Sequence, residues 1–131
     1  MAKAKMVKEL TFDTPDRPGL LSEISEALAK AKVNVSYLCA WAMDDRAYFM
    51  MVTENNSKAK KALSGLGYKA KEDGIIGVEL PNKAGAMRDV ARKIADAGIN
   101  ISFVDCTAIG KSAMGFLSTS DDKKAIKAIN K

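Results

Sequence analysis

The chain has 131 residues, of which 47% are hydrophobic and 28% charged, and its formal net charge is +5. It has no histidine and two cysteines, at positions 39 and 106. These counts exclude histidine-based catalysis, histidine-ligated zinc, cysteine-rich metal clusters and a disulfide framework, so we expect neither a metal nor a cofactor, and a reducing cytoplasm as the location.

Residues 1–73 predict strands and helices in the order β-α-β-β-α-β. Pro18 and Gly19 form a tight turn after the first strand, and apolar residues then recur at helical spacing. Two alternating segments joined by a short turn predict a β-hairpin, and Ser57 is the predicted cap of the second helix. The expected elements are strand 7–13, helix 20–31, strand 34–43, strand 46–53, helix 57–66 and strand 68–71.

Residues 74–131 predict the same order without its last strand. The second copy is expected to begin after Glu72-Asp73-Gly74. The expected elements are strand 75–80, helix 86–97, strand 100–108, strand 112–118 and helix 122–130.

The two halves are copies of one pattern. A shift of 66 residues aligns them without a gap, places Pro15 on Pro81, and keeps the chemical type of most unlike pairs. A repeated burial pattern indicates two copies of one fold. The sequence therefore predicts two domains, residues 1–73 and residues 74–131.

The predicted fold class is α+β, with two ferredoxin-like βαββαβ repeats, each an antiparallel sheet with helices on one face. The second repeat lacks its last strand. The N-terminal segment or a second chain completes that edge, or the edge stays open and must be protected. The hairpin residues 35–42 are apolar on both faces, so we expect the other repeat or a second copy of the chain to cover the second face.

The turn between the first strand and the first helix of each repeat is a candidate binding site. Gly19 and Gly85 let the backbone approach a ligand closely, and the helical N–H groups that follow, beginning at Leu20 and Ala86, suit a carboxylate or a phosphate. The alternative is that proline and glycine are there merely to make the corner.

An asparagine opens the second strand of each repeat, Asn34 in the first and Asn100 in the second. Its amide offers a donor and an acceptor to a ligand at the turn. The alternative is an asparagine that caps the end of the preceding helix.

Two pairs of segments resemble the ACT domain, and the resemblance extends over about residues 5–131. The first pair is VKELTFDTPDRPGLL (7–21) with AKAKVNVSY (29–37), and the second is IGVELPNKAGAM (76–87) with ADAGINISF (95–103). The resemblance implies a stand-alone tandem of small-molecule sensor domains, usually for amino acids, that pair through strands or helices and hold the ligand between copies.

The resemblance also implies which residues contact the amino acid. They are Asp16, Gly19 and Asn34 in the first repeat and Asn82, Gly85 and Asn100 in the second, with the helical N–H groups at Leu20 and Ala86. The second repeat suits a carboxylate better, whereas Asp16 in the first favours a positive group. The chain departs from the family pattern in three ways, because Ala84 replaces a proline, the last strand is missing and no catalytic domain is attached.

Two other functions are weighed against this one. RNA-binding modules share the strand and helix order and the chain is basic, but its charges are interspersed and its one echo of an RNA-binding motif is Arg46-Ala47-Tyr48-Phe49. No nucleophile stands beside a base, so we predict no catalytic residue and no enzyme, and we interpret both cysteines as buried thiols.

The sequence therefore predicts a regulatory protein that binds a free amino acid or a similar small ligand, as a homodimer. A biosynthetic enzyme is a possible partner, and a tandem transcriptional regulator is the variant of the same hypothesis. No apolar run is long enough for a membrane span, so no membrane partner is expected.

Overall fold

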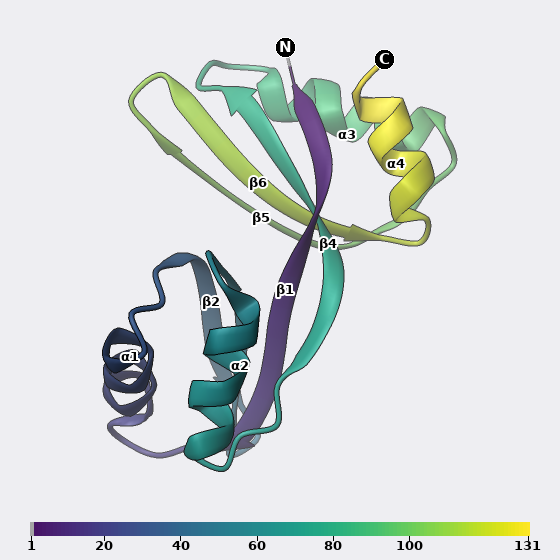
Figure 1. Ribbon diagram of the computed structural model, residues 1–131. Coiled ribbons are helices and arrows are strands. Elements are labelled where there is room, and N and C mark those ends of the chain that lie inside the picture. The colour runs from purple at the N-terminus through teal and green to yellow at the C-terminus, as the bar shows by residue number, and fades with distance from the viewer. Residues whose placement is uncertain (1) are drawn as a thin grey trace. The chain divides into compact units, whose positions relative to one another are not determined.

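The computed structural model describes residues 2–131 and repeats one order of strands and helices (Figure 1). The elements are β1 (Lys3–Pro15), α1 (Leu20–Lys30), β2 (Val35–Met43), β3 (Arg46–Thr53), α2 (Asn56–Gly65), β4 (Lys71–Pro81), α3 (Ala86–Asp96), β5 (Ile101–Ile109), β6 (Ser112–Thr119) and α4 (Asp122–Ile129). The predicted α+β fold with ferredoxin-like repeats is confirmed.

The chain divides into two compact units. The first unit is residues 8–73, and the second is residues 74–131 together with residues 2–7. The sequence repeat groups residues 2–7 with the first half, but in the structure they belong to the second unit.

In the first unit the strands are hydrogen-bonded in the order β2-β3-β1-β4, with α1 and α2 on one face. Phe12 of β1 lies opposite Phe49 of β3, and their stacked rings have centroids 4.9 Å apart. Leu20, Ile24 and Leu28 of α1, four residues apart, are buried against this face. Each such side chain contributes about 1.5–3 kcal/mol by leaving water.

In the second unit the order is β1-β4-β6-β5, and the core is built from the corresponding positions. Ile76 of β4, Ile94 of α3 and Leu117 of β6 are fully buried. Ala4 of β1 is buried in the same core. The N-terminal segment thus supplies the fourth strand that residues 74–131 lack, which is one of the outcomes that the sequence left open.

The N-terminal strand is fastened to the second unit by Asn130, just after α4. The Ala4 N–H donates to Asn130 Oδ1 at 2.7 Å, and Asn130 Nδ2 donates to the Ala4 carbonyl at 2.9 Å. The side-chain amide therefore bonds to both backbone groups of one strand residue, as a neighbouring strand would.

We expect Asn130→Ala to destabilise the second unit by about 1–3 kcal/mol, because it removes both partners of partly buried Ala4 backbone groups. Asn130→Asp keeps an acceptor for the N–H group and loses the donor to the carbonyl, so its cost should be intermediate. Denaturant titration followed by NMR signals of each unit measures both variants. Equal midpoints for wild type and Asn130→Ala would contradict the role of this side chain.

Two local predictions are wrong. The predicted strands 68–71 and 75–80 are not separate, because a single strand, β4, runs from Lys71 to Pro81. A Cβ at Gly74 would lie 2.8 Å from Met6 Sδ, so a larger residue there requires the Met6 side chain to move. The cap of α2 is Asn55 and not Ser57, because Asn55 Oδ1 accepts a hydrogen bond from the Lys58 N–H at 3.1 Å.

Candidate functional site

The turns before α1 and α3 share a backbone geometry that requires glycine. Gly19 has a φ of +90° and Gly85 a φ of +88°, in the left-handed region that other residues enter at a cost. Each is the N-cap of its helix. Leu20 and Ala86 follow with side chains buried in the core, so these two residues offer a ligand their backbone and not their side chains.

The helices differ in how their N-termini are capped. The Asn55 and Asp121 side chains cap α2 and α4 by accepting backbone N–H groups. Glycine provides no such acceptor at α1 and α3. In α3 the Ala86 N–H donates to the Lys83 carbonyl at 3.3 Å. The other first-turn N–H groups of α1 and α3 have no side-chain cap and lie at the positive end of the helix dipole.

The polar residues of each turn are tied to the tip of the neighbouring hairpin. The Asp16 N–H donates to the Asp45 carbonyl at 2.9 Å, and the Asp16 side chain is exposed. In the second unit the Asn82 N–H donates to the Lys111 carbonyl at 2.9 Å, and its Nδ2 donates to the Gly110 carbonyl at 2.8 Å. The Asn82 amide is therefore oriented by the hairpin, which leaves its Oδ1 for a donor.

Both asparagines of the predicted site are exposed and precede a strand. Asn34 Nδ2 donates to Glu54 Oε1 at 3.2 Å, and the Asn100 backbone N–H donates to Ser120 Oγ at 3.1 Å. The C-cap residues of the preceding helices are Ala31 and Ala97, so the alternative of a capping asparagine does not describe these helix ends.

Within one unit, the turn and the asparagine lie at opposite ends of the same helix. α1 has 11 residues, about 16 Å of helix, and separates Gly19 from Asn34. The register of the sheet also separates the turn from the asparagine. Pro15, beside the turn, pairs with Arg46, where β2 ends, whereas Val35, beside the asparagine, begins β2 and pairs with Thr53. A single unit therefore does not bring the predicted site residues together.

Each unit exposes apolar side chains on its outermost hairpin strand. Leu38 of β2 is 40% exposed and Val104, its counterpart in β5, is 50% exposed. Between β2 and α1 runs a groove of about 170 Å³. Its lining includes Leu21, Leu28, Val35 and Leu38.

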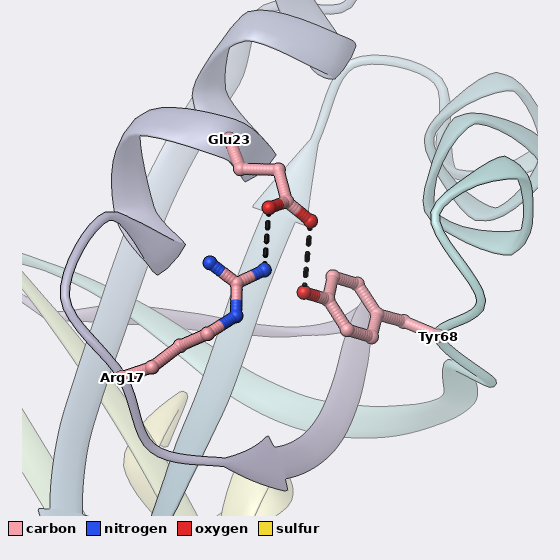
Figure 2. Close-up of polar contacts among 3 residues, drawn as sticks. All are labelled: Arg17, Glu23 and Tyr68. Carbon is pink, nitrogen blue, oxygen red and sulfur yellow. Dashed lines mark hydrogen bonds and ion pairs between the residues drawn. The ribbon is translucent and has the colours of Figure 1, made fainter.

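A polar cluster that the sequence analysis did not identify lies beside the first turn (Figure 2). Arg17 of the turn forms an ion pair with Glu23 of α1, and the Tyr68 hydroxyl donates to the other oxygen of Glu23 at 3.0 Å. The pairing of Arg17 with Glu23 could have been found from the sequence, since the two residues are six positions apart around the start of a helix. Tyr68 is 45 residues from Glu23 in the sequence, so no local pattern indicates that it contacts Glu23.

The cluster shifts the pKa values of its members. Hydrogen bonds from Arg17 and then from Tyr68 lower the pKa of Glu23, and the same ion pair raises the pKa of Arg17. Burial, followed by the hydrogen bond to Glu23, raises the pKa of Tyr68. All three shifts favour the charge state in which Glu23 is an anion, Arg17 a cation and Tyr68 a neutral donor.

Because the Glu23 pKa is lowered in the folded protein, its contribution to stability is present above the unfolded value, near 4.5. It is lost as the pH falls through the folded value. We expect Glu23→Gln to unfold at a lower urea concentration than wild type at pH 7, and the gap to close at pH 3. A gap of the same size at both pH values would contradict the pairing.

The prediction that both cysteines are buried is wrong. Cys106 is exposed and Cys39 is half-buried, because both lie on the outermost strand of their unit. Burial and the neighbouring Asp105 carboxylate raise the pKa of the Cys106 thiol, which lowers its reactivity. Among residues 2–131, no group of three or more potential ligands is placed to hold a metal ion.

The segment that resembles an RNA-binding motif, residues 46–49, does not display its aromatic rings as a base-stacking motif does. Phe49 is buried in the core, and Tyr48 stacks on Trp41 with ring centroids 5.5 Å apart. Over residues 2–131, the helices are all too short or too polar to cross a membrane.

The ACT domain model matches residues 8–64 and residues 74–131. No curated protein matches the chain. Among solved structures, protein BT0572 from Bacteroides thetaiotaomicron is similar, with a TM-score of 0.90, 26% identity, and coverage of 97% of this chain and 88% of that one.

Two further solved structures show the same fold at lower identity. The ligand-free regulatory subunit of aspartate kinase from Thermus thermophilus has a TM-score of 0.69 and 14% identity, covering 98% of this chain and 94% of that one. E. coli aspartokinase III in complex with aspartate and ADP has a TM-score of 0.63 and 12% identity, and the match covers 98% of this chain but 32% of that one.

Proposed function

Because the chain belongs to the ACT domain family, we propose that it is a regulatory protein that binds a free amino acid and catalyses no reaction itself. One observation carries the proposal. The first helix of each unit, α1 or α3, begins at a left-handed glycine without a side-chain cap, whereas α2 and α4 are capped by Asn55 and Asp121. An anion such as a ligand carboxylate suits a helix N-terminus that no side chain caps.

The polar side chains of the site complement the rest of an amino acid. Asp16 accepts hydrogen bonds from an ammonium group, and the Asn82 Oδ1 does so at the second turn. Asn34 and Asn100 supply a donor and an acceptor for the remaining polar groups.

We propose a homodimer, because one unit keeps each turn about one helix length from its asparagine. A second molecule that lies alongside an exposed edge strand brings its own asparagine to the turn. The exposed apolar side chains Leu38 and Val104 on the two outermost strands support this arrangement, since dimer interfaces bury such side chains.

We propose a biosynthetic enzyme of amino-acid metabolism as the protein that responds to the ligand, in the cytoplasm. The support is the fold shared with the regulatory subunit of aspartate kinase. A tandem regulator of transcription is the variant of the same proposal. Affinity capture from a lysate with and without amino acids separates the two, because one variant retains an enzyme and the other retains DNA.

A thermal-shift screen of all twenty amino acids tests the binding proposal. We expect at least one to raise the unfolding temperature, since a ligand at 100 times its Kd adds about 2.7 kcal/mol to the stability of the folded state. Asn100→Ala should reduce that shift without lowering the unfolding temperature of the free protein, because the Asn100 side chain is exposed. A screen without any shift beyond buffer refutes amino-acid binding.

A further inference from the structure

The cluster of Arg17, Glu23 and Tyr68 joins three segments of the first unit. Arg17 comes from the turn, Glu23 from the first turns of α1, and Tyr68 from the segment after α2 (Figure 2). Tyr68 is itself fixed, because its N–H donates to the Leu63 carbonyl at 3.0 Å and its ring stacks on Phe12 with centroids 5.2 Å apart. One oxygen of the Glu23 carboxylate thus accepts a hydrogen bond from Arg17, and the other accepts one from the Tyr68 hydroxyl, whose ring is held in place.

The cluster lies on one flank of α1, and the groove toward the edge strand lies on the other. Glu23 faces Tyr68 and α2, whereas Leu21, Ser25 and Leu28 line the groove beside β2. The Arg17 guanidinium is therefore drawn toward α2 and away from the edge-strand flank, where we place the second molecule. Its charge is also neutralised by Glu23.

The second unit has no such cluster among the described residues. The counterparts of Arg17 and Glu23 at the 66-residue shift are Lys83 and Asp89. Asp89 contacts the adjacent Arg88 at 3.2 Å instead. The second turn therefore has a lysine with no carboxylate bonded to it in the structure.

We propose that Glu23 and Tyr68 are specificity-determining positioning residues that hold Arg17 away from the ligand. The first turn then favours the ammonium group of an amino acid, through Asp16, more than the second turn does, and the second turn favours its carboxylate more, with help from Lys83. The inference rests on the proposed function and deepens it. The two sites then differ in ligand chemistry although their backbones are alike.

Two probes that each carry half of an amino acid separate the two preferences. N-acetylglycine has a carboxylate without an ammonium group, and glycinamide has an ammonium group without a carboxylate. The amide NMR signals of Gly19 and Gly85 in the full-length protein report on the two turns. We expect N-acetylglycine to shift the Gly85 signal at lower concentration than the Gly19 signal, and glycinamide to show the reverse order.

Glu23→Gln releases Arg17, so we expect N-acetylglycine to bind the first turn about tenfold more tightly while its affinity at Gly85 stays unchanged. The double variant Arg17→Gln, Glu23→Gln must lose this gain. Tyr68→Phe keeps the ring packing, removes the hydroxyl alone and should give a smaller gain. The proposal is overturned if Glu23→Gln leaves the titration of Gly19 unchanged, or if the double variant keeps the gain.

A second measurement decides the positioning role without any ligand. The Asp16 N–H, which donates to the Asp45 carbonyl, should exchange with solvent at least about threefold faster in Glu23→Gln and Tyr68→Phe. Unchanged exchange in both variants overturns the positioning role. If no probe or amino acid shifts either glycine signal in the wild type, the proposed function fails. The exchange rate of the Asp16 N–H then still tests whether Glu23 and Tyr68 hold Arg17 in position.

Discussion

Deleting residues 2–7 is expected to unfold the second unit and to leave the first folded. Removal of this strand takes Ala4 out of the core and exposes one side of β4, where Ile76 and Val78 are fully buried. A unit of about 60 residues is near the lower size limit for independent folding. The loss of a whole strand therefore exceeds the few kcal/mol by which such a unit is stable.

NMR spectra resolve the two units and measure this effect directly. After the deletion, signals of residues 74–131 should collapse to random-coil positions, while signals of residues 8–73 stay dispersed. A circularly permuted chain gives the matched control. It starts at Lys8 and carries residues 2–7 after residue 131 on a short Gly/Ser linker. The Asn130 contact with Ala4 shows that the two ends lie close together, so this chain should fold. A folded second unit in the deletion variant would contradict the role of the N-terminal strand.

Gly85→Val is expected to abolish ligand binding at the second turn. Valine is strained at a φ of +88°, by about 1–2 kcal/mol, and its Cβ would lie 3.1 Å from Arg88 Nη2. The change therefore displaces both the turn and the guanidinium beside it. The N–H groups of α3 no longer present the arrangement that a carboxylate needs.

Gly98→Val is the matched control, because Gly98 also has a positive φ, of +73°, but a Cβ there would meet nothing within 4 Å. Both variants should unfold at lower temperature than wild type by similar amounts. Only Gly85→Val should lose the response to the amino acid found in the thermal-shift screen. An intact ligand response in Gly85→Val would remove the second turn from the site.

The fold was largely predictable, because burial follows local periodicity. Ile24 and Val90 occupy the same helical stripe in the two repeats, and both are buried. The pairing of residues 2–7 was left open, because strand partners are chosen over long sequence distances, here between β1 and β4. The continuous β4 was missed for a related reason, since Gly74 lies beside Met6, which only the folded chain brings near.

The candidate site was predictable where its chemistry is local. Gly19 and Gly85 follow from the turn motif, and both have the positive φ that only glycine adopts at low cost. The separation of each turn from its asparagine was not foreseen, because it depends on the length of a folded helix. The role of Tyr68 was also missed, since no sequence pattern links it to Glu23, 45 residues away.

The strand shared by the two units has a consequence for synthesis on the ribosome. Residues 2–7 are synthesised before residues 74–131, in which their partners lie. The first unit is complete once Asp73 has emerged, and its strand β1 then extends into six residues that have no partner. The second unit therefore closes only after residues 74–131 have emerged, and until then residues 2–7 form a free strand that is prone to pair with other chains.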